Sequence, residues 1–292
     1  MTPSEGPGGA RPEAGWPRLA LGGATGLLAM TVALGGAAMA WGQGEGVRLH
    51  AAGSLRAPLT EVARDFTGAS GIPVVPVFGA SGLLRERLER GEPGDVFASA
   101  NMEHPETLAR AGQAGPVVMF ARSRLCALTR PEVGITGDTL LERMLDPGVT
   151  LGTSTPRADP SGNSAWEVFR RAEALRPGNQ ARLEAKARQV VGGPASPPPP
   201  TDRSVYAQLL ADRQVDVFLT YCTNAAQAVR ELSSLQVMSL PAPLAVGADY
   251  GLTVLAAGHQ ERSGRLVSFI LSPEGQAILT RHGFTAPTAP GS

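Results

Sequence analysis

The stretch from Val74 to Gly91 constrains the fold most strongly, because it joins a strand, a turn and a helix in one short run. Val74 to Phe78 is apolar, which is typical of a buried strand. Gly79 to Gly82 forms a turn, and leucines at helical spacing follow until Gly91 ends the helix. A serine in such a turn, here Ser81, commonly caps the helix. The free N–H groups and the helix dipole at this position also attract anions.

Strand and helix signals alternate along most of the chain. We expect further strands at residues 47–52, 95–100, 117–128, 149–153, 215–221, 236–240 and 250–256, and helices at 55–66, 103–111, 140–145, 165–175, 180–191, 202–211, 259–271 and 273–282. Four consecutive prolines place residues 192–200 in an extended surface loop. The alternation predicts an α/β fold with largely parallel sheets.

The long apolar run at residues 117–128 has a polar break at its centre, as expected of a strand that crosses between two lobes. We therefore predict two Rossmann-like α/β lobes, joined by crossing strands, with a ligand cleft between them. Lobe I comprises residues 47–123 and 250–288, and lobe II comprises residues 124–249. In open α/β sheets, ligands bind beyond the carboxyl ends of the strands.

Residues 1–40 have the character of a targeting segment. A polar stretch rich in Gly and Pro precedes the apolar run from Leu19 to Ala40, which ends in an A-x-A pattern at Ala38 to Ala40. We predict a signal peptide over residues 1–40, which directs the rest of the chain to the periplasm. The alternative is an uncleaved membrane anchor, since the apolar run is long enough to span a bilayer.

Charge and cysteine content narrow the function further. The chain has 26 basic and 26 acidic residues, so no net charge favours nucleic acid or an anionic membrane. Cys126 and Cys222 both lie in apolar surroundings that fit buried strands. They are either two small core residues or, in an oxidising compartment, a disulfide. No spacing of His, Cys, Asp and Glu indicates a zinc site.

Small polar residues stand between strand and helix at four places. These are Gly53-Ser54-Leu55, Ala80-Ser81-Gly82, Pro160-Ser161-Gly162-Asn163 and Asp202-Arg203-Ser204. Each serine alone fits an ordinary helix cap, but two of the four fall in each predicted lobe. Tyr221 ends a buried strand, so its hydroxyl is expected at the same cleft.

Three of the chain's motifs resemble the periplasmic molybdate-binding proteins of ABC transporters, which have the type II periplasmic solute-binding fold. They are Ala51-Ala-Gly-Ser-Leu55, Phe78-Gly-Ala-Ser-Gly82 and Gly94-Asp-Val-Phe-Ala-Ser-Ala100, and the likeness continues to residues 275–284. The resemblance implies two lobes that close on a tetrahedral oxyanion, molybdate or tungstate. It also implies delivery to the permease and ATPase of an ABC importer, and we expect a monomer.

The resemblance also implies the contacts of the oxyanion. Hydroxyls of Ser54, Ser81 and Tyr221 would bind it, together with a backbone amide near Ser161 and one at Arg203 or Ser204. A fully ionised oxyanion only accepts hydrogen bonds, so a site built from donors fits this chemistry. We expect no cofactor, no metal and no nucleic-acid partner.

Two other classes of function remain as alternatives. Sulfate, phosphate or an organic anion is one alternative ligand, and a phosphate site requires an inward carboxylate, for which Asp159 and Asp202 are the nearest candidates. Both residues fit turn or cap positions. A serine hydrolase using Ser81 is the other alternative, but the Gly-x-Ser-x-Gly turn needs a glycine where Leu83 stands. We therefore expect no catalytic residues.

Overall fold

The computed structural model describes residues 46–198 and 203–287. The predicted signal peptide at residues 1–40 lies outside these residues, and so does Asp202. Within the described residues, no helix is both long enough and apolar enough to cross a membrane.

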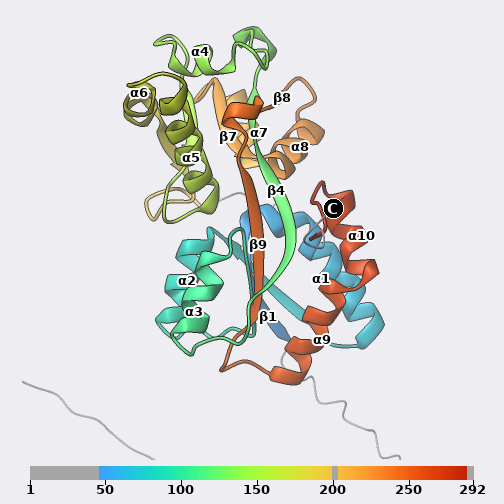
Figure 1. Ribbon diagram of the computed structural model, residues 1–292. Coiled ribbons are helices and arrows are strands. Elements are labelled where there is room, and N and C mark those ends of the chain that lie inside the picture. Colours follow the sequence, from blue (N-terminus) through green and yellow to red (C-terminus); the bar gives the residue numbers. More distant parts are fainter. Residues whose placement is uncertain (1–45, 199–202, 288–292) are drawn as a thin grey trace, which may run out of the picture. The chain divides into compact units, whose positions relative to one another are not determined.

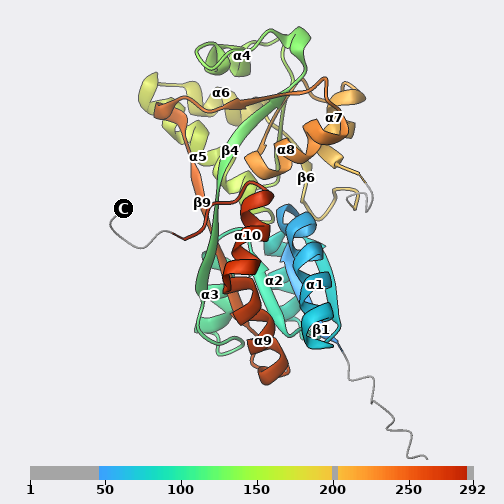
Figure 2. The ribbon, with the colours of Figure 1, turned by 90° about the vertical axis from the view of Figure 1, so that its right-hand side faces the viewer.

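The first lobe is built around β1, which pairs in parallel with β2 on one side and β3 on the other. Its strands are β1 (Val47–Ala52), β2 (Val74–Gly79) and β3 (Val96–Ser99), and its helices are η1 (Gly53–Leu55), α1 (Arg56–Ser70), α2 (Ser81–Glu89), α3 (Glu103–Arg110), α9 (Gln260–Leu271) and α10 (Pro273–Arg281). Helices α2 and α3 cover one face of this sheet, and α1, α9 and α10 cover the other (Figures 1 and 2).

The second lobe is built around β5, which pairs in parallel with β6 and β7. Its strands are β5 (Leu151–Ser154), β6 (Arg188–Val191), β7 (Val217–Tyr221) and β8 (Gln236–Ser239), and its helices are η2 (Pro131–Val133), α4 (Leu140–Leu145), α5 (Pro160–Leu175), α6 (Asn179–Lys186), α7 (Val205–Ala211), α8 (Cys222–Glu231) and η3 (Ala242–Leu244). Helices α5 and α6 pack together, as do α7 and α8.

Two long strands belong to both lobes. These strands, β4 (Val118–Thr129) and β9 (Gly247–Val254), pair antiparallel, with a register shift between Met119 and Ala121. Strand β9 also pairs with β3 of the first lobe, and β4 pairs with β7 and β8 of the second. Figure 1 shows both strands running from one group of helices to the other. The predicted pair of α/β lobes joined by crossing strands is confirmed, and the predicted lobe boundaries fall inside β4 and β9.

Some expectations about local structure are wrong. The helix expected over residues 180–191 ends at Lys186, and residues 188–191 form β6 instead. This segment contains the β-branched pair Val190 and Val191, which suits a strand, and it lies alongside β5. Cys222, expected in a strand, begins α8. The sheets are only partly parallel, because every pairing that involves β4 or β9 is antiparallel.

The core is aliphatic, in keeping with an aromatic content of only 5%. A large cluster of buried residues runs through both lobes, from Leu49 and Val62 beneath α1 to Phe169 on α5. Smaller clusters lie under α2 and α3, where Leu84 and Leu108 are buried, and around Phe218 beneath α7 and α8. Each face of the sheets is therefore covered by an apolar helix surface.

The two lobes touch directly at the start of α2. The backbone N–H of Gly82 donates to the carbonyl of Ala158, in the loop before α5, at 2.8 Å. A Cβ atom at position 82 would lie 2.3 Å from the carbonyl oxygen of Arg157. Only glycine permits this approach, so the sequence Ser81-Gly82 fixes both the helix start and the contact between lobes.

A disulfide joins Cys126 on β4 to Cys222 at the start of α8, with Cα atoms 4.9 Å apart. Of the two possibilities that the sequence left open, the structure therefore has the disulfide and not two unpaired core cysteines. The bond ties the crossing strand to the helix that follows Tyr221.

We expect the Cys126→Ala/Cys222→Ala double variant to lose about 4–5 kcal/mol of the free energy of unfolding. The two residues are 96 positions apart, and the chain-entropy model assigns roughly this stabilisation to a loop of about 100 residues. Denaturation in guanidinium chloride measures the loss, with the reduced wild type as a control. Alkylation of two thiols in the unreduced wild type, seen by mass spectrometry, would refute the bond.

Candidate functional site

A cavity of about 690 Å³ lies where the parallel strands of both lobes end. The residues at or just after the six carboxyl ends all line it, namely Ala52, Gly79, Ala100, Thr155, Val191 and Tyr221. Of the six residues predicted to bind the ligand, Ser54, Ser81, Arg203, Ser204 and Tyr221 line this cavity. The structure therefore brings these five together at the edge where an α/β sheet binds ligands.

Ser81 is fully buried and opens α2. Its Oγ accepts a hydrogen bond from the backbone N–H of Ala100 at 3.1 Å. The hydroxyl proton of Ser81 therefore remains available to donate into the cavity.

Tyr221 is the last residue of β7 and is almost completely buried. Its hydroxyl donates to the carbonyl of Ala100 at 3.3 Å. Ala100 thus links Ser81 of the first lobe to Tyr221 of the second. Burial, and to a smaller extent the negative charge of Asp159, raise the pKa of Tyr221, so its phenol stays neutral. Its single proton must leave the Ala100 carbonyl to donate to a ligand.

Ser54 is held by another tyrosine, Tyr250. Its Oγ lies 3.0 Å from the hydroxyl of Tyr250, on the crossing strand β9. The ring of Tyr250 is buried and packs at 5.6 Å from the ring of Tyr221 and at 5.2 Å from that of Phe284. The side chain of Ser54 is therefore oriented by a residue that belongs to the strands joining the lobes.

Ser161 is placed differently from the other five. It is buried and does not line the cavity, although the preceding residue, Pro160, does. Its Oγ donates to Ser154 Oγ at 2.8 Å. Its backbone N–H, the amide expected to bind the ligand, donates to the carboxylate of Asp159 at 2.9 Å. The role of Ser161 as a ligand contact stays a prediction, and in this structure its amide donates to Asp159, whose carboxylate caps α5.

Asp159, which the sequence offered as a candidate carboxylate for a phosphate site, lines the cavity. Burial raises its pKa from 3.8 to about 6, although hydrogen bonds from Ser161 and Ser154 act in the opposite direction. The loop after β6 encloses it, because a Cβ atom at Gly192, where φ is +73°, would lie 2.5 Å from Asp159 Oδ2. The side chain is thus both the helix cap that its sequence indicated and a carboxylate at the cavity.

Arg203 and Ser204 directly precede α7, and Ser204 is its N-cap. Arg203 is exposed at the cavity. The N–H of Ser204 donates to Glu231 Oε2 at 2.5 Å, and its Oγ accepts from the N–H of Ala207 at 3.3 Å. The backbone N–H of Ser204 and the acceptor side of its Oγ therefore already have partners. Only the proton of its hydroxyl remains to donate to a ligand.

Several lining residues were not expected from the sequence, among them Arg56, Tyr206 and Asn224. The Arg56 guanidinium stacks at 4.8 Å on the ring of Phe78 and has no hydrogen bond or ion pair within residues 46–198 and 203–287. Burial lowers the pKa of Arg56, yet the group remains cationic at neutral pH. The sequence feature that could have predicted Arg56 at the cavity is its position two residues after Ser54.

Tyr206 and Asn224 form a polar group in the second lobe. Asn224 Nδ2 donates to the hydroxyl of Tyr206 at 3.1 Å and to Thr220 Oγ1 at 3.0 Å. The chain has only three tyrosines, and all three lie at the cavity or directly behind it. No histidine lines the cavity, and the described residues contain no group of three or more His, Cys, Asp and Glu side chains placed to hold a metal.

Comparison with protein families matches residues 47–285 to the bacterial extracellular solute-binding proteins. An uncharacterised protein of Pasteurella multocida is 36% identical over 240 residues, covering 82% of this chain and 98% of its own. This chain therefore belongs to the bacterial extracellular solute-binding protein family. The molybdate-binding protein ModA of Mycobacterium tuberculosis is 25% identical over 254 residues, covering 82% of this chain and 84% of its own.

Solved structures show the same fold. The periplasmic molybdate-binding protein of Azotobacter vinelandii is similar with a TM-score of 0.65, at 18% identity, over 83% of this chain and 100% of its own. The sulfate-binding protein SubI of Mycobacterium tuberculosis gives 0.67 at 18%, over 83% and 87%. AfuA of Actinobacillus pleuropneumoniae, with fructose-6-phosphate bound, gives 0.65 at 14%, over 84% and 88%. The predicted type II periplasmic binding protein fold is thereby confirmed.

The raised pKa of Asp159 makes stability depend on pH. The native carboxyl holds its proton up to a pH of about 6, whereas the unfolded one releases it near 3.8. Its contribution to stability is therefore present below about pH 3.8 and is lost as the pH rises through 6. We expect the Asp159→Asn variant to lack this loss, because asparagine caps a helix equally well and does not ionise.

Denaturation of the wild type and Asp159→Asn at pH 4.5 and pH 7.5 measures this difference. The variant should gain stability relative to the wild type at the higher pH. Asp138→Asn, which removes an exposed carboxylate, controls for the loss of one negative charge. Parallel behaviour of the wild type and Asp159→Asn across this range would contradict the raised pKa.

Proposed function

We propose that this protein is an extracytoplasmic receptor that captures a small oxyanion in the cavity between its lobes and delivers it to an ABC importer. The observation that carries the proposal is the convergence of three hydroxyls, from Ser54, Ser81 and Tyr221, on one cavity. All three stand where a strand gives way to a helix, so helix N-termini add to the attraction for an anion. The cationic Arg56 at the same cavity adds to it.

Among inorganic oxyanions, molybdate is the first candidate, with tungstate beside it. The three sequence motifs that carry Ser54 and Ser81 support it, and so does the similarity to ModA over most of the chain. In this proposal the segment over residues 1–40 is a signal peptide, the protein acts in the periplasm, and a permease and ATPase receive the ligand. The protein binds its solute without transforming it, and no residue has a catalytic role.

A second candidate is an oxyanion that keeps a proton, such as hydrogen phosphate. Asp159 favours it, because a carboxylate at the cavity accepts a hydrogen bond from a protonated ligand and repels a fully ionised one. Its Oδ1 already accepts from the Ser161 N–H, but a carboxylate can accept several hydrogen bonds. The two candidates therefore differ in what Asp159 does to affinity.

We expect a panel of molybdate, tungstate, sulfate and phosphate to raise the melting temperature of the purified protein selectively. If molybdate is the ligand, Asp159→Asn should bind it roughly tenfold more tightly or better at pH 7.5, because a like charge has left a partly desolvated site. If hydrogen phosphate is the ligand, the same variant should bind phosphate more weakly. Absence of a shift with every one of these anions would argue against an oxyanion receptor.

We expect Tyr221→Phe to weaken binding of the preferred anion by about ten- to a hundredfold, since a hydrogen bond to a charged group is worth about 1.5–3 kcal/mol. Isothermal titration calorimetry measures this loss. Thr129→Val is the matched control, because it removes a buried hydroxyl that donates to the carbonyl of Asp216, away from the cavity. An unchanged affinity in Tyr221→Phe would remove this hydroxyl from the site.

A further inference from the structure

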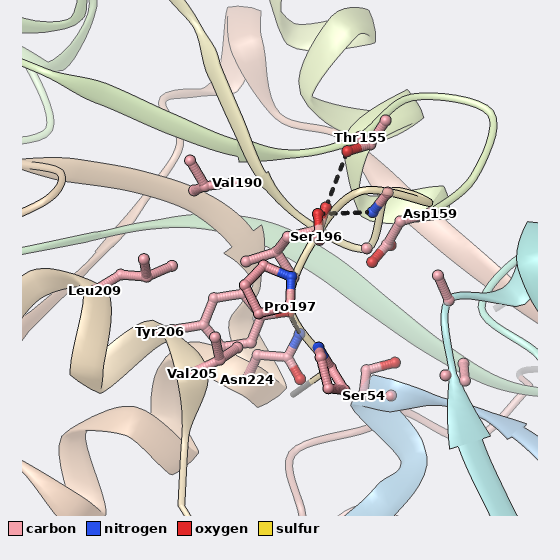
Figure 3. Close-up of a pocket in the computed structure, with 18 of the residues that line it drawn as sticks. Ser54, Thr155, Asp159, Val190, Ser196, Pro197, Val205, Tyr206, Leu209 and Asn224 are labelled. Atoms are coloured by element: carbon pink, nitrogen blue, oxygen red, sulfur yellow. Dashed lines mark hydrogen bonds between the residues drawn. The ribbon is translucent and has the colours of Figure 1, made fainter. Parts of the chain in front are cut away.

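The cavity continues well beyond the group of hydroxyls that binds the oxyanion. In Figure 3, Ser54 and Asp159 lie at one side, and Val190 and Leu209 lie at the far side, with Val205, Tyr206 and Pro197 between them. These last five residues, which we call the apolar wall, come from β6, the loop after it and α7. The hydroxyl end and the apolar wall belong to one continuous space.

The apolar wall is a stable surface, backed by the second-lobe core. Leu209 is buried, while Val190, Val205 and Tyr206 pack against the cluster that contains Phe218. The ring of Tyr206 meets the ring of Phe218 edge to face at 5.1 Å. Apolar groups held in this way beside a polar anchor are typical of sites for organic molecules, in which a few polar groups fix the orientation.

The size of the cavity points in the same direction. Its volume of about 690 Å³ lies within the range of roughly 300–1,000 Å³ that is usual for organic ligands and cofactors. A five-atom oxyanion needs only the space of a few water molecules, each with about 30 Å³ of liquid volume. A bare oxyanion bound at Ser54 and Ser81 would leave the apolar wall facing water.

Asp159 narrows the chemistry of the charged group. A phosphate monoester has a second pKa of about 6, so near neutral pH it takes up one proton at small energetic cost, and the resulting P–OH can donate to a carboxylate. A sulfate ester or a carboxylate ligand has no such proton and would meet Asp159 as a like charge. Among organic anions, a phosphate monoester therefore fits both the hydroxyls and the carboxylate.

We infer that the solute of this protein is an organic phosphate monoester, whose phosphate occupies the oxyanion site and whose organic body lies on the apolar wall. This inference rests on the proposed function, since it uses the same oxyanion site, and of the two candidate anions it selects the protonated phosphate over molybdate. It adds a subsite in the second lobe, formed by Val190, Pro197, Val205, Tyr206 and Leu209, that selects for the body of the solute.

Calorimetry with phenyl phosphate, phenyl sulfate, inorganic phosphate and molybdate tests the inference on the purified protein. Phenyl phosphate should bind about ten- to a hundredfold more tightly than inorganic phosphate, because burial of its ring removes apolar surface from water. It should also bind at least about tenfold more tightly than phenyl sulfate, which has no proton to donate. In Asp159→Asn the difference between the two esters should narrow.

Val205→Phe places a ring of the protein's own in the proposed subsite. This variant should lose most of the preference for phenyl phosphate over inorganic phosphate, while its affinity for inorganic phosphate changes by no more than about twofold. Val75→Phe is the matched control, since Val75 lies on β2, outside the cavity, and is 51% exposed. Val205→Thr, which keeps the side chain's shape, is the second variant and should lower the preference in the same direction.

The outcomes separate the inference from the proposed function. If inorganic anions bind but phenyl phosphate has no advantage, the subsite is refuted and the oxyanion receptor stands. An advantage that survives in Val205→Phe also refutes the subsite. If none of the four probes binds, the proposed function fails and the inference fails with it.

Discussion

The antiparallel pairing of β4 with β9 is the interaction on which the other features of this structure depend. Because each strand belongs to both lobes, the sheet of one lobe is continuous with the sheet of the other. This continuity directs the carboxyl ends of six parallel strands at a single cavity. Tyr250 lies on β9 and orients Ser54, and the disulfide anchors β4 to the helix that follows Tyr221. The framework therefore also positions the polar groups of the site.

Much of this arrangement was predictable from the sequence, because it repeats one local pattern. Ser54 and Ser81 each follow a strand and precede a helix, and parallel strands bring such turns to the same edge. Asp159 shows the limit of this reasoning. Its sequence correctly indicates a helix cap, but its place at the cavity depends on the close approach of Gly192, more than thirty positions away. Gly192 comes close to Asp159 because residues 188–191 form β6 beside β5, whereas the sequence pattern had predicted a helix over residues 180–191.

If the cavity binds an anion as proposed, the charge of Asp159 would affect the binding free energy as strongly as one or two hydrogen bonds. A hydrogen bond from a neutral donor to a charged ligand contributes about 1.5–3 kcal/mol. Two unit charges roughly 6 Å apart, at an effective dielectric constant of about 20, interact with about 3 kcal/mol. Repulsion between Asp159 and each charge of a dianion would thus offset one or two of the hydroxyl contacts. A protonated ligand changes the sign of this contribution, because the carboxylate then accepts a hydrogen bond.

The two lobes consequently contribute different kinds of recognition. In the proposed function, the first lobe would recognise negative charge through Ser54, Ser81 and the guanidinium of Arg56, which line the cavity. The second lobe would recognise the protonation state and the bulk of the solute through one carboxylate and an apolar surface. A site divided in this way binds with full strength only when both lobes contact the same molecule. Since the lobes already touch through Gly82 and Ala158, a solute that spans the cavity gains its contacts without separating them.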